Sequence, residues 1–81
     1  MKPNRKCAEC VRLWRDYKKA TTQHVDLLAR QRIAYLRHQH RQAVILQEMV
    51  EEADEERGAA LQAIRTHEQA DHPQAGADAV A

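Results

Sequence analysis

The sequence is short of the residues that build sheets, tight turns and large cores. Its 81 residues include two glycines, two prolines and three aromatic side chains, and phenylalanine is absent. Between Cys7 and Ala70 there is no proline, and Gly58 is the only glycine. This composition predicts long helices and an all-α fold. A chain this short buries little apolar surface, so we expect it to need a metal, a disulfide or a second subunit.

Long hydrophobic runs are also missing. No run of about 18 apolar residues is present, so the sequence predicts no helix that spans a membrane. The charged N-terminus has no apolar segment behind it, which argues against a signal peptide. We therefore expect a cytoplasmic location. In that reducing compartment, two cysteines are expected as free thiols or metal ligands rather than as a structural disulfide.

The net charge of +1 hides an asymmetry between the two halves of the chain. Residues 1–41 carry 11 Lys and Arg against 3 Asp and Glu, whereas residues 42–81 carry 2 against 9. Either the halves lie side by side and neutralise each other, or the basic half binds nucleic acid. We favour the first interpretation, because basic residues that face an acidic helix lose much of their attraction for phosphate.

Apolar residues recur every three or four positions in both halves, as in coiled-coil helices. Residues 38–42 interrupt this rhythm but contain neither glycine nor proline, so the signal for a turn is weak. Two architectures are compatible with the pattern. One is a single helix of about 60 residues and about 90 Å. The other is an antiparallel hairpin of two helices, folded near residue 39 or 40.

The hairpin explains more of the sequence than the rod does. It brings the basic half against the acidic half, and it aligns Trp14 with Ile64 and Leu28 with Val50. It also returns the end of the chain to its beginning. We therefore predict an N-terminal lead, a hairpin and a flexible tail, at residues 1–6, 7–72 and 73–81, with helices at about 8–38 and 42–71.

Metal-binding residue types lie at the beginning and at the end of the chain segment that forms the predicted hairpin. Cys7 and Cys10 have the Cys-x2-Cys spacing of a zinc half-site, and His67 and His72 have a spacing that zinc fingers accept. Pro73 follows the second histidine, so that residue can leave the helix and turn back. We predict a structural Zn²⁺ site with these four side chains as ligands, which would fasten the open end of the hairpin.

Other uses of the same residues stay open. Glu68 and Asp71 could support the imidazoles or replace a ligand. Two chains could share one zinc through Cys7 and Cys10 from each. A metalloenzyme would need three protein ligands and a water, with Glu68 or Asp71 as base. A redox role for the cysteine pair is disfavoured by the sequence, because such motifs usually follow a strand, and no strand is predicted.

His24 is a polar residue on the apolar stripe of the first helix. The predicted fold places it near Asp54 or Arg57. It could act as a catalytic base, but a buried histidine satisfied by a neighbouring side chain is the commoner case. We therefore expect a structural role for His24.

The motifs together resemble a set of short uncharacterised bacterial proteins. Those proteins begin Cys-x-x-Cys-x-x-Leu-Trp-x-x-Tyr and end His-Glu-x-x-x-His, as this chain does at 7–17 and 67–72. The resemblance implies a bacterial helical hairpin and no particular activity. The chain also looks loosely like the zinc-bearing coiled-coil hairpins that bind RNA polymerase. Those carry four cysteines and an acidic tip, whereas this chain has two cysteines and a basic tip, so that function is not carried over.

The sequence thus predicts a small zinc-binding helical interaction or regulatory module without catalysis. Two helices alone give a core on one side only, so we expect a homodimer that forms a four-helix bundle. A further protein partner is compatible with this role but cannot be named from the sequence. The residues expected to face the second chain are Leu27, Leu28, Tyr35, Leu46 and Val50.

Overall fold

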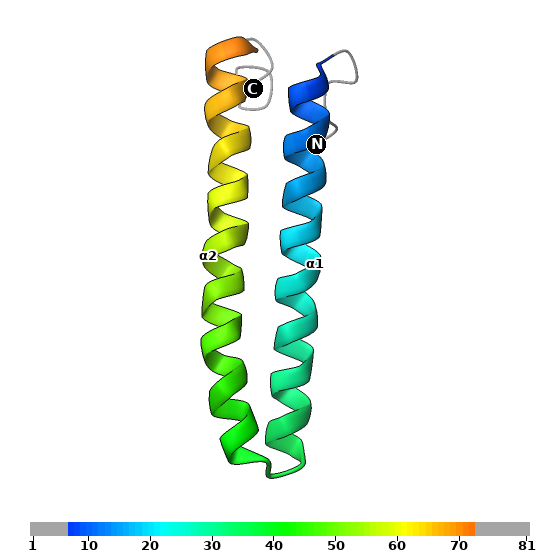
Figure 1. Cartoon of the computed structure of the whole chain (residues 1–81), viewed down its shortest axis with the longest axis vertical. Coiled ribbons are helices and arrows are strands. Elements are labelled where there is room, and N and C mark those ends of the chain that lie inside the picture. The colour runs from blue at the N-terminus through cyan, green and yellow to red at the C-terminus, as the bar shows by residue number, and fades with distance from the viewer. Residues whose placement is uncertain (1–6, 73–81) are drawn as a thin grey trace, which may run out of the picture.

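A computed structural model describes residues 7–72 and shows a hairpin of two helices. Helix α1 (Ala8–Leu36) and helix α2 (His40–Asp71) run antiparallel and pack against each other along their length (Figure 1). The molecule measures 50 × 24 × 16 Å. The predicted hairpin is confirmed and the single rod is excluded. The predicted lead at 1–6 and tail at 73–81 lie outside the described residues.

The turn between the helices has the three residues that the sequence predicted but lies two positions earlier in the chain, because α1 ends at Leu36 and α2 begins at His40. His38 adopts the left-handed conformation with φ 60°. Its N–H donates to the Tyr35 carbonyl at 3.1 Å, and the Gln39 N–H donates to the Ala34 carbonyl at 2.9 Å. These are the two bonds of a Schellman motif, which usually has glycine at the left-handed position. A histidine there explains why the sequence carried so weak a signal for a turn.

The core between the helices is narrow and built from small and medium side chains. Ala34 and Ala43 are 2% and 0% exposed. Alanine at these positions lets the two helix backbones approach closely near the turn. The buried cluster consists of Leu27, Ala34, Ala43, Leu46, Val50 and Ala53.

The prediction that Leu27, Leu46 and Val50 face a second chain is wrong. All three are less than 8% exposed, because they pack between α1 and α2. Leu28 follows Leu27 by one residue, which is about 100° around the helix, and therefore points outward. Leu28 and Tyr35 remain 42% and 53% exposed.

Two polar pairs fix the alignment of the helices. Gln31 is buried on α1, and its side-chain nitrogen donates to the Gln47 side-chain oxygen on α2. The His24 imidazole lies 3.9 Å from the Asp54 carboxylate, as the sequence predicted. Both pairs have the same midpoint as the aligned apolar residues. The predicted register is therefore the observed one, and a slip by one turn would leave Gln31 buried without a partner.

Large apolar side chains also lie on the outer surface of the half of the hairpin nearest the turn. Leu36 is the most exposed of them, at 75%. We call these side chains the turn-half apolar surface; its members are Val25, Leu28, Ile33, Tyr35, Leu36, Val44, Ile45 and Met49.

Within residues 7–72, neither α1 nor α2 combines the length and the apolar character that a membrane-spanning helix needs.

Gly58 offers a direct test of helix energetics in α2. A Cβ atom added at this position would meet nothing within 4 Å. We expect Gly58→Ala to raise the free energy of unfolding by about 1 kcal/mol, because glycine loses more backbone entropy than alanine in a helix. Urea denaturation measures the change. The neighbouring Ala59→Gly is the matched control and should have the opposite sign; an unchanged midpoint for Gly58→Ala would contradict the interpretation.

Candidate metal centre

The open end of the hairpin brings the four predicted ligands together. Cys7 and Cys10 lie at the start of α1, and His67 and His72 at the end of α2. One ligand atom from each side chain lies within 4.8 Å of the other three. Two thiols and two imidazoles from opposite ends of the chain could therefore hold one metal ion.

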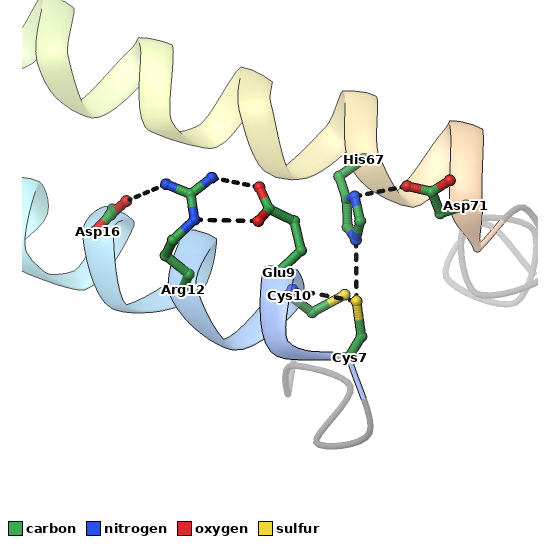
Figure 2. Close-up of polar contacts among 7 residues, drawn as sticks. All are labelled: Cys7, Glu9, Cys10, Arg12, Asp16, His67 and Asp71. Carbon is green, nitrogen blue, oxygen red and sulfur yellow. Dashed lines mark hydrogen bonds and ion pairs between the residues drawn. The ribbon is translucent and has the colours of Figure 1, made fainter.

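Cys7 is the N-cap of α1 and owes its place to the start of the helix. Its backbone is extended (φ −109°, ψ 111°), and its Sγ accepts a hydrogen bond from the Cys10 N–H at 3.4 Å (Figure 2). The cysteine sulfur accepts the capping hydrogen bond that a serine or aspartate oxygen usually accepts at this position. The cap holds the Cys7 sulfur beside the buried Cys10, which is 5% exposed.

The surroundings of Cys7 favour its thiolate. The Cys10 N–H, then the His72 and His67 imidazoles, lower the pKa of Cys7 from 9.0 to about 6. The same contact acts in the other direction on the histidine, since the hydrogen bond with Cys7 raises the pKa of His67. A thiolate is the form in which cysteine binds metals.

His67 is held between a sulfur and a carboxylate. Its Nε2 lies 3.3 Å from the Cys7 Sγ, and its Nδ1 lies 2.9 Å from the Asp71 carboxylate one turn further along α2 (Figure 2). A carboxylate on one ring nitrogen orients the imidazole so that the other nitrogen faces the ligand position. Asp71 thus lies where a residue that supports His67 would be expected.

His72 leaves the helix, as the following proline led us to expect. Helix α2 ends at Asp71, and the His72 N–H bonds to the Glu68 carbonyl at 2.8 Å. Glu68 thus contributes its backbone to the cap, and its carboxylate is not part of the four-ligand group. The rings of His72 and His67 lie edge to face, with centroids 5.2 Å apart.

One buried atom indicates that the cluster suits a metal. Within residues 7–72, the Nε2 of His72 is buried and has no hydrogen-bond partner of normal geometry, although the imidazole is close enough to Cys7 to lower the pKa of that thiol. A buried polar atom without a partner costs about 1–3 kcal/mol. A metal ion held by the Nε2 of His72 would satisfy this nitrogen, so the residues present fit such an ion.

A charged pair beside the cluster was missed by the sequence analysis. Glu9 lies between the two cysteines and pairs with Arg12, which is also 3.6 Å from Asp16 (Figure 2). Glu9 also helps to raise the pKa of His67. The spacing of three and four residues on one helix is the signal that could have found this pair.

The pKa of Cys7 leads to a prediction for the metal-free chain. We expect its alkylation by iodoacetamide, located by peptide mass, to rise with a midpoint near pH 6. In the unfolded chain, the Cys7 thiol should titrate at about pH 8.5. Because the folded pKa is the lower one, the ionised thiol stabilises the fold above the unfolded pKa, and this stabilisation is lost as pH falls through about 6. A folded-state midpoint equal to that in urea would contradict the described contacts.

No family model, no curated protein and no solved structure matches this chain.

Proposed function

We propose that the chain is a small zinc-binding helical interaction or regulatory module in which the metal is structural and catalysis is absent. The observation that carries the proposal is the meeting of four ligand atoms, from both ends of the hairpin, within 4.8 Å. A metal bound there would join α1 to α2 at the end opposite the turn. A chain with so narrow a core gains most from such a link.

The donor set favours zinc over other common metals. Two thiolates and two imidazoles form one of the standard tetrahedral zinc sites, whereas magnesium and calcium prefer oxygen ligands. Four protein ligands fill a tetrahedral shell and leave no position for a substrate. A structural role follows from that closed shell, and a catalytic role would require one of the four side chains to be displaced.

Metal analysis of the purified chain tests the proposal. We expect one zinc per chain when the protein is prepared without chelator, and a tetrahedral cobalt spectrum with two thiolate ligands after substitution. Cys7→Ser and His67→Ala should both lose the metal. Ala8→Ser and His40→Ala are the matched controls, because both residues are exposed and lie outside the cluster.

Three other outcomes of the metal analysis would contradict the proposal, each in a different way. One zinc per two chains that persists in His67→Ala would indicate a metal shared through the cysteines of two chains. An exchangeable water on the cobalt would indicate an open catalytic position and a metalloenzyme. A chain without any bound metal would contradict the proposal itself.

We also propose that a second copy of the chain covers the turn-half apolar surface. The eight side chains of this surface are large, apolar and exposed, and none of them belongs to the buried cluster between α1 and α2. Part of the surface is an open hollow on the outer side of α1, lined by residues that include Val25, Leu28 and Leu36. Sedimentation equilibrium should show a dimer, and Leu36→Glu should give monomers; a monomeric wild type would contradict this proposal.

A further inference from the structure

The open end of the hairpin places a nucleophile, a base and a carboxylate in a row. The Cys7 Sγ is 3.3 Å from the His67 Nε2, and the His67 Nδ1 is 2.9 Å from Asp71. A cysteine next to a histidine that a third group orients is the usual arrangement of an activated thiol. A second sulfur, that of Cys10, lies within 4.8 Å. The cluster therefore holds everything that a two-step thiol oxidation requires, apart from the oxidant.

We propose that Cys7 and Cys10 are oxidised to a disulfide by a hydroperoxide, and that this disulfide and the bound metal exclude each other. The second part rests on the metal site proposed above; the first does not. The sequence argued against redox chemistry because no strand precedes the cysteines. The structure supplies activating groups of a different kind, from the far end of the chain.

The first step forms a sulfenic acid on Cys7. Its thiolate attacks one oxygen of the hydroperoxide, the O–O bond breaks, and the sulfur loses two electrons to the departing oxygen. The His67 Nε2 faces the sulfur. In the protonated form of His67, this nitrogen gives its proton to that oxygen. With hydrogen peroxide, the products are Cys7 sulfenic acid, water and a neutral imidazole.

The second step forms the disulfide. The Cys10 thiol passes its proton to the neutral His67 and attacks the Cys7 sulfur, and the S–O bond breaks. The departing hydroxide recovers the proton from His67 as water. In total, one hydroperoxide takes two electrons from the two sulfurs, and two waters leave when hydrogen peroxide is the oxidant.

Exposure decides which cysteine reacts first. Cys7 is partly exposed at the edge of the cluster, whereas Cys10 is 5% exposed. A small hydroperoxide can therefore reach the first sulfur and not the second. Cys7 also precedes the helix and has an extended backbone, so its side chain can turn toward Cys10 to reach the S–S bond length of about 2.05 Å.

The disulfide has a consequence for the hairpin. Both sulfurs belong to the first turn of α1, so their bond makes no link to α2. It removes two of the four ligands and leaves His67 and His72 without a metal to hold. Oxidation would therefore release the ion and remove the link that it makes between α1 and α2, while the turn and the core near it keep their contacts.

Hydrogen peroxide, added to the full chain in its metal-free and zinc-loaded forms, tests the proposal. In the metal-free form, we expect the intact mass to fall by two hydrogens at a rate at least about tenfold above that of free cysteine at neutral pH. In the loaded form, a chromophoric chelator should detect zinc released in proportion to the disulfide formed.

Variants assign the steps. Cys10→Ser should stop at a sulfenic acid that dimedone labels on Cys7, and Cys7→Ser should resist oxidation. His67→Gln should slow the metal-free reaction to about the rate of free cysteine, because the positioned acid and base is lost, while circular dichroism confirms its helices. His40→Gln, an exposed histidine at the other end of the molecule, should react as the wild type does.

Several results would overturn the proposal: a metal-free chain that reacts no faster than free cysteine, label on Cys10, disulfides between chains only, or zinc retained by the oxidised chain. A chain that takes up no zinc would overturn the metal function and, with it, the mutual exclusion of metal and disulfide. The mass measurement on the metal-free chain would still decide whether Cys7 and Cys10 form the disulfide.

Discussion

Stripping zinc from the loaded chain is expected to lower its melting temperature by roughly 15–30 °C. A ligand that binds only the folded state stabilises it by about 4 kcal/mol when its free concentration is a thousand times its Kd. For a chain of this size, each kcal/mol moves the melting temperature by about 4–8 °C. Thermal unfolding followed by circular dichroism, with and without a chelator, measures the shift.

Substitution of a single ligand should abolish the same shift. In Cys10→Ser the melting temperature should be low and independent of zinc, whereas His40→Ala should keep the full response. If chelator leaves the wild-type melting temperature unchanged, the metal does not hold the open end of the hairpin, and its structural role is wrong.

Leu46→Ala is expected to remove about 2–5 kcal/mol from the free energy of unfolding. Leu46 is 5% exposed and lies in the buried cluster between the helices. Truncation would lose its transfer free energy and leave a cavity that two rigid helices cannot close. For a chain of this length, that loss is a large part of the whole stability. Urea denaturation of the wild type and the variant, both with saturating zinc, measures this loss. The contribution of the metal site is the same in both proteins and cancels in the difference.

Two variants distinguish lost packing from other effects. Leu46→Met keeps the volume nearly constant and should cost less than about 1.5 kcal/mol. Val11→Ala truncates a side chain that is 42% exposed and should change stability by no more than about 0.5 kcal/mol. Equal losses for Leu46→Ala and Val11→Ala would contradict the described core.

The sequence was sufficient to predict the hairpin and its register. Three features of the sequence indicated one fold: apolar residues recur at helical spacing, the charge changes sign at mid-chain, and residues match across that centre. The contacts of Gln31 with Gln47 and of His24 with Asp54 confirm the alignment. Such agreement is expected for long helices, whose pairing is fixed once the position of the turn is known.

The assignment of inward and outward residues failed where two large apolar side chains are adjacent. Leu27 and Leu28 both fit a stripe of period three to four, and only the packing against α2 shows that Leu27 is the inner one. The turn was equally hard to place. Its Schellman hydrogen bonds are made by backbone groups, and His38 in the left-handed conformation gives no sequence signal.

The cluster of cysteines and histidines was predicted from the spacing within each pair and from the hairpin that brings the pairs together, but its internal order was not. Sequence could not show that Cys7 caps α1 or that His67 sits between its sulfur and Asp71. These contacts depend on rotamers and on the path of the chain after Asp71. They are also the contacts on which the oxidation chemistry depends.

The hairpin places both described ends of the chain at one pole, with the turn at the other (Figure 1). The long dimension is 50 Å, so the two poles are too far apart for a ligand at one to touch the other. Residues 7 and 72, where the described part of the chain begins and ends, therefore lie at the same pole as the cysteines and histidines. A protein that docks near the turn would meet a shape that is independent of whatever occupies those side chains.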